Sequence, residues 1–79
     1  MSWLITHTLE ALNLEHVQRL YADKAKVKAI VVGGIPVNVA VDLDPDVAKR
    51  LVREIVDQVA QGYSVEVVGA EVRRVTTLR

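Results

Sequence analysis

Apolar and polar residues alternate most regularly between Ile35 and Leu43. The odd positions of this stretch are all apolar, and the even positions between them are small or polar. A period of two predicts a β-strand with one buried face and one face toward solvent. The preceding stretch, Lys24–Val32, starts amphipathic and ends apolar, and Gly33 and Gly34 separate the two. Because glycine readily adopts positive φ, these residues predict a β-hairpin.

After Asp44 the apolar positions take the spacing of a helix. They recur every four residues, at Val47, Leu51, Ile55 and Val59. Asp44 is suited to the N-cap, Pro45 to the first helical position, and Gly62 to the position that follows the helix. The sequence therefore predicts an amphipathic helix between these signals, with a wide apolar stripe that lies on a sheet.

The N-terminal residues fit two structures. A strand over Trp3–Ala11 is one, and it would turn Trp3, Ile5 and Leu9 toward the core. A helix is the other, because Ile5, Leu9 and Leu12 are spaced four and three residues apart. We favour the strand, since β-branched residues such as threonine are enriched in strands.

A second helix is predicted over Leu14–Ala22. Asn13 is a good N-cap residue. The residues after it form an apolar stripe with near-helical spacing, made by Leu14, Val17, Leu20 and Tyr21. This stripe would lie on a different side from that of the preceding residues, so a break at Asn13 is expected.

Two valine-containing stretches, Ser64–Val68 and Glu71–Val75, follow the helix and are joined by Gly69 and Ala70. They fit one long strand with a glycine bulge at Gly69. They also fit a hairpin in which Val67 faces Val72, which makes better cross-strand pairs. Both alternatives remain open from the sequence.

Joined together, the elements have the order β-α-β-β-α-β, with an extra C-terminal strand if the last stretch is a hairpin. This order resembles the ferredoxin-like sandwich, an α+β fold with an antiparallel sheet and two helices on one face. The resemblance is to a general plan that many functions share, so it implies no particular activity. We expect residues 1–79 to form a single small α/β domain.

Composition points to self-association. The chain has 79 residues, of which 51% are hydrophobic, and its formal net charge is zero. A domain of this size buries a modest share of its surface, and it has no cysteine for disulfides or cysteine-ligated metals. Association with further copies is the remaining way to bury more apolar surface. We expect a homo-oligomer, a dimer or larger.

Nothing in the sequence predicts export or insertion into a membrane. No basic segment of a signal peptide follows Met1, and the longest apolar run is too short to span a bilayer. We therefore expect a cytoplasmic protein with no membrane partner. The absence of cysteine and the single methionine also fit a thermophilic source.

No motif for a catalytic, metal or cofactor site is present. Asp42, Asp44 and Asp46 resemble the start of a calcium loop, but the glycine and the distal glutamate of such a loop are missing. We interpret them as a helix cap. His7 and His16 are the only histidines, and they lack a metal-ligand spacing. An enzyme that uses either histidine with a carboxylate is a minor hypothesis.

The basic residues offer an alternative function. Three lysines alternate along one predicted strand and two arginines lie near the C-terminus: Lys24, Lys26, Lys28, Arg73 and Arg74. Such a group could bind the phosphates of a nucleic acid. Phenylalanine is absent, and the predicted central strands carry no aromatic residue on which bases could stack. Lysines on an edge strand also prevent unwanted sheet pairing.

The leading functional hypothesis is a non-enzymatic homo-oligomer with a small ligand between its subunits. Ala40, Val68 and Val72 are expected to leave the outer face of the sheet less polar than a solvated face. Pairing of such faces would bury them. The residues that would hold the ligand are not predicted.

Overall fold

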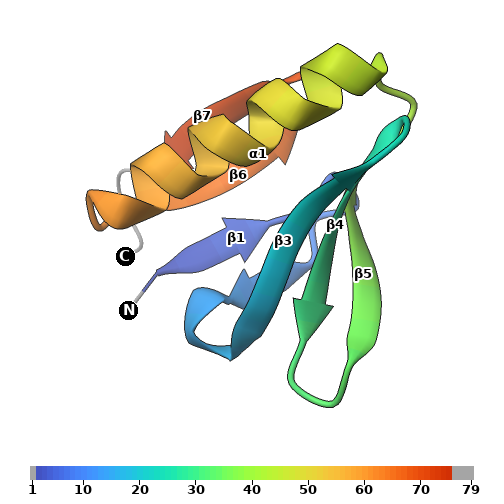
Figure 1. Ribbon diagram of the computed structural model, residues 1–79. Helices are drawn as coiled ribbons and strands as arrows, with labels where there is room; N and C mark the ends of the chain where they lie inside the picture. Colours follow the sequence, from blue (N-terminus) through green and yellow to red (C-terminus); the bar gives the residue numbers. More distant parts are fainter. Residues whose placement is uncertain (1, 76–79) are drawn as a thin grey trace.

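Seven β-strands and one α-helix make up residues 2–75, the part of the chain that the computed structural model describes (Figure 1). The elements in chain order are β1 (Trp3–Ile5), β2 (Ala11–Asn13), the 3₁₀-helix η1 (Leu14–His16), β3 (Val17–Asp23), β4 (Lys26–Val31), β5 (Ile35–Ala40), α1 (Pro45–Ala60), β6 (Ser64–Val68) and β7 (Glu71–Val75). The prediction of a ferredoxin-like α/β sandwich with two helices is wrong. Within the described residues the fold is rich in strands and has a single α-helix.

The strands form two sheets instead of one. One sheet has the order β2-β1-β6-β7, and the other has the order β3-β4-β5. The β1–β6 pair is parallel, and the other neighbouring pairs are antiparallel. A 2.9 Å hydrogen bond from the backbone nitrogen of His7 to the carbonyl oxygen of Val39 links the end of β1 to β5.

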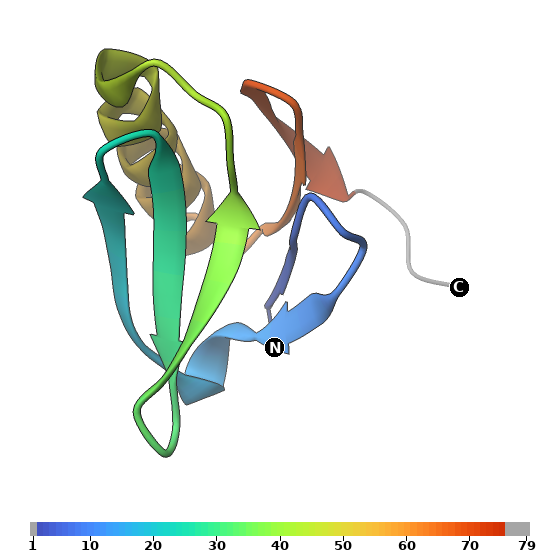
Figure 2. The ribbon, with the colours of Figure 1, turned by 90° about the vertical axis from the view of Figure 1, so that its right-hand side faces the viewer.

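The helix packs against both sheets. It contacts β3 and β4 of the three-stranded sheet and β6 and β7 of the other. Figure 2 shows α1 behind the three-stranded sheet, with the other strands beside it. Both sheets and the helix contribute buried side chains to the space between them. The four-stranded sheet contributes Leu4, Val65 and Val67, the three-stranded sheet contributes Val27, Ala29 and Val39, and the helix contributes Ala48, Leu51 and Ile55. The two sheets and the helix therefore share one core, whereas the sequence predicted one sheet covered by two helices.

The predicted helix over Leu14–Ala22 is a short 3₁₀ turn followed by strand β3. Asn13 does act as a cap, since its side chain accepts a hydrogen bond from the nitrogen of Glu15 at 3.0 Å. A register shift between Val17 and Arg19 then inserts one extra residue into β3. A bulge of this kind keeps residues three positions apart on one face of a strand, which imitates helical spacing. The helical spacing of Val17 and Leu20 therefore belongs to a bulged strand, and the prediction of a helix over Leu14–Ala22 is wrong.

The first strand is shorter than predicted, and its faces are reversed. The chain turns after β1 and returns as β2, so Trp3–Ala11 is not one strand. Leu4 and Thr6 are fully buried, whereas Leu9 is 77% exposed in the connecting turn. Leu9 has a φ of 64° there. The prediction that Trp3, Ile5 and Leu9 face the core is wrong because the buried side of β1 is the even one.

The predicted β4–β5 hairpin is confirmed, although β5 ends earlier than expected, at Ala40. The pairing shifts by one residue at Val39, and both Val39 and Ala40 are buried. The strict alternation therefore ends at this irregularity. The carbonyl of Val39 accepts the hydrogen bond from His7, so the same irregularity joins the two sheets.

The boundaries of α1 follow the sequence signals. Asp44 caps the helix through a 2.9 Å hydrogen bond from the nitrogen of Asp46 to its Oδ1 atom, and Pro45 opens the first turn. Gly62, with a φ of 89°, follows the end of the helix. At the C-terminal end, β6 and β7 form the hairpin alternative, with Val67 opposite Val72 and a glycine turn.

Candidate functional site

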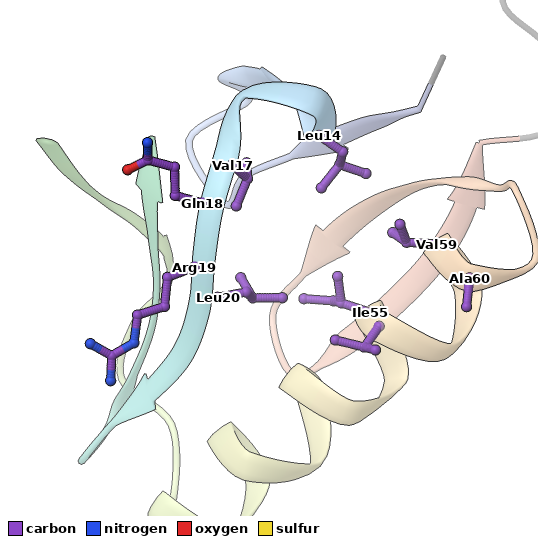
Figure 3. Close-up of a pocket in the computed structure, with 9 residues that line it drawn as sticks. Leu14, Val17, Gln18, Arg19, Leu20, Ile55, Val59 and Ala60 are labelled. Carbon is purple, nitrogen blue, oxygen red and sulfur yellow. The ribbon is translucent and has the colours of Figure 1, made fainter. Parts of the chain in front are cut away.

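An apolar groove lies between β3 and the C-terminal half of α1 (Figure 3). Its volume is about 320 Å³. The residues along it are Leu14, Val17, Gln18, Arg19 and Leu20 on the strand side, and Ile55, Val56, Val59 and Ala60 on the helix. Because most of these side chains are hydrocarbon, the groove is suited to an apolar ligand or to apolar side chains of a partner.

The bulge in β3 builds one wall of the groove. Val17 and Leu20 lie on the helix side of β3, and Gln18 and Arg19 point away from it (Figure 3). The Arg19 guanidinium lies 4.6 Å from the centre of the Tyr21 ring, which holds this charge outside the groove. The strand wall therefore presents apolar side chains to the helix.

The helix supplies the other wall. Ile55 is buried and Val59 is half-buried, but Val56 is 51% exposed. The apolar arc of α1 is thus wider than the surface that the two sheets cover. The extra valine at position 56 was the signal in the sequence that could have indicated this groove. What sequence reasoning missed was the strand wall, because that segment was assigned to a helix.

A smaller hollow lies on the four-stranded sheet. It has a volume of about 210 Å³ and is lined by Trp3, Ile5, Ala11, Ser64 and Val75. The Ser64 hydroxyl accepts a 2.9 Å hydrogen bond from the Trp3 backbone nitrogen. That bond ties β1 to β6, so it gives this serine a structural role.

The prediction that Ala40, Val68 and Val72 form an exposed apolar face of one sheet is wrong. Ala40 is 1% exposed and belongs to the core, and Val72 is half-buried. Only Val68 is well exposed, at 40%, next to the β6–β7 turn. The irregular pairing at Val39 explains the burial of Ala40, because it turns two successive residues of β5 inward.

The acidic residues and histidines do not converge on one site. Within residues 2–75 no group of three or more histidines and carboxylates is placed to hold a metal ion. Asp44 and Asp46 form the helix cap, as interpreted from the sequence. His7 lies in the β1–β2 turn and His16 at the end of η1, and both are exposed.

The five basic residues of the alternative function lie on two different sheets. Lys24, Lys26 and Lys28 belong to the β3–β4 hairpin, and Lys28 forms an ion pair of 3.1 Å with Asp23. Arg73 and Arg74 belong to β7.

Both arginines of β7 have local partners. Arg73 lies 3.6 Å from Glu71, and the Arg74 side chain binds Gln58 of the helix and covers the ring of Tyr63. The three lysines therefore lie in one hairpin, whereas the two arginines lie in the other sheet. Binding of nucleic acid through these residues stays a prediction.

Comparison of the chain with protein-family models, with curated proteins and with solved structures found no match. In the described part of the chain, α1 lacks the length and apolar character that a helix needs to cross a bilayer.

Proposed function

We propose that this protein is a non-enzymatic domain that works as a homo-oligomer, with a small ligand bound in the groove between its subunits. The observation that carries the proposal is the apolar groove between β3 and α1, with Val56 half exposed on its rim. An isolated domain leaves this hydrocarbon surface in water, and a second copy would remove it from water.

The size and charge of the chain support association with itself. The described residues expose 5084 Å² in total, and the core of this small domain consists mainly of valine, alanine and leucine side chains. Because the formal net charge is zero, no long-range repulsion opposes contact between copies. Further burial at an interface would add stability that the small core alone does not provide.

The groove also sets the chemistry of the ligand. Its walls are aliphatic, and the polar ends of Gln18 and Arg19 point away from it. A small apolar molecule would therefore gain mainly from burial, at about 25 cal/mol for each Å² removed from water. Closure of the groove by a second subunit would increase that burial.

Native mass spectrometry of the purified protein, combined with light scattering over a range of concentrations, tests the proposal. We expect a dimer or larger oligomer, and additional mass of a small apolar molecule on the oligomer. A monomer at every concentration up to about 1 mM, the limit of weak specific association, would contradict the proposal.

A further inference from the structure

The exposed edge of α1 carries an ordered row of apolar residues. Val52, Val56 and Ala60 are spaced by four residues, so they lie one above another on the helix. Val52 is half-buried, whereas Val56 and Ala60 are exposed. The row runs along the rim of the groove, because Val56 and Ala60 both line it.

A row of charged and polar residues runs directly beside the apolar one. It consists of Lys49, Arg53, Asp57 and Gln61, and all four are exposed. The positive charges lie toward the start of the helix and the negative charge toward its end. The row is therefore complementary to a second copy of itself that runs in the opposite direction.

We propose that two copies of this chain pair through α1 in antiparallel orientation, with a two-fold axis between their Val56 side chains. This pairing rests on the proposed function and specifies its interface. In antiparallel helices related by a two-fold axis, the same flank of each helix meets its counterpart. Arg53 of each copy then lies level with Asp57 of the other, and the contact occurs twice.

The apolar rows fit the same arrangement. When Arg53 and Asp57 are level, the axis crosses α1 at the level of residue 55, and the two Val56 side chains lie on either side of it. Val52 of each copy lies just beyond Val56 of the other, so the side chains interleave. A parallel two-fold pair would instead bring the charged flank of each helix to the opposite flank of the other, so the Arg53 and Asp57 side chains of the two copies would not meet.

The apolar row of α1 is too small to form a stable dimer interface alone, so the interface must also include the groove. A stable dimer buries roughly 800 Å² on each partner, and one row on a helix about 24 Å long supplies only part of it. The other flank of the apolar row borders Val59 and the groove wall formed by Val17 and Leu20. Contact of the second copy with this wall would supply the rest.

The first test removes the central apolar contact. We expect Val56→Glu to raise the dissociation constant of the dimer at least 100-fold in sedimentation equilibrium, because two unpaired carboxylates would be buried together. The matched control is Val32→Glu, at a valine that is 60% exposed in the β4–β5 turn. The control is expected to dimerise like the wild type.

The second test uses the charges, at exposed positions that tolerate substitution. Arg53→Asp alone and Asp57→Arg alone should each raise the dissociation constant about tenfold or more, because two like-charge contacts replace two ion pairs. A mixture of the two single variants should form a heterodimer in native mass spectrometry. The double variant carrying both changes should regain the wild-type dissociation constant.

The outcomes separate this pairing from the proposed function. A wild-type oligomer that is unaffected by Val56→Glu and by both charge reversals would overturn the helix pairing and leave the oligomeric function standing. A wild-type protein that stays monomeric up to about 1 mM would overturn both. A monomer with an apolar molecule in the groove would overturn the pairing and the oligomeric part of the proposed function, because the ligand would then occupy the groove without a second copy.

Discussion

Single residues decide where the elements of this protein begin and change direction. Asp44 starts the only α-helix of residues 2–75 by accepting a hydrogen bond from the nitrogen of Asp46. Val39, at the shifted register of β5, turns its carbonyl to His7 and so links two sheets. The cap at Asp44 is local, whereas the link at Val39 depends on His7, which is more than thirty residues away in the chain.

The cap of α1 makes a prediction at the scale of one residue. Asp44→Ala should lower the free energy of unfolding by about 0.5–2 kcal/mol, because the nitrogen of Asp46 loses its acceptor. Asp44→Asn is the matched control, since asparagine caps helices about as well as aspartate. Urea denaturation at one fixed protein concentration measures both. Equal losses in the two variants would show that the cap is not the cause.

At the scale of the element, β3 is the strand whose structure most affects the groove. Its bulge places Val17 and Leu20 on one face although they are three residues apart. The extra residue is Gln18, which falls between the paired positions Val17 and Arg19. The same three-residue spacing also occurs in helices, so the sequence alone predicts a helix for this segment.

Deletion of Gln18 should therefore be tolerated. Without the extra residue, Val17 and Leu20 become two positions apart, and a regular strand keeps such residues on one face. Deletion of Ala22, which lies in the regular part of β3 opposite Val27, should instead turn the preceding side chains to the wrong face. Thermal unfolding is expected to be cooperative in the first variant and severely destabilised in the second. The reverse order would refute the role of the bulge.

The N-terminal and C-terminal hairpins show a different relation between sequence and structure. The alternative with Val67 opposite Val72 was open from the sequence, and the observed register confirms it. For Trp3–Ala11 the favoured strand is correct only over Trp3–Ile5, because the chain then turns and returns as β2, which pairs with β1. The parallel partner of β1 is β6, and no local pattern near Leu4 indicates a strand sixty residues away.

At the scale of the whole molecule, association and stability should be coupled. A ligand or partner that binds only the folded state stabilises it in proportion to the logarithm of its concentration. In the proposed dimer the partner is a second copy of the chain, so stability should depend on protein concentration.

We therefore expect the Tm of the wild type to rise by about 3–6 °C for each tenfold increase in concentration, as expected for a small dimer. Val56→Glu should have a Tm that does not change with concentration. Differential scanning calorimetry at three concentrations measures this. A wild-type Tm that does not vary with concentration would argue against a stabilising dimer.

The sequence by itself determined the features whose causes lie within a few residues. The ends of α1, its apolar stripe, the glycine turn between β4 and β5, and the cap at Asn13 all depend on local hydrogen bonds and on backbone preferences. The tertiary structure decided the number of sheets, the strand nature of β3, the burial of Ala40 and the existence of the groove. Each of these depends on which distant segments pair, because strand hydrogen bonds and the shared core are formed between residues far apart in the chain.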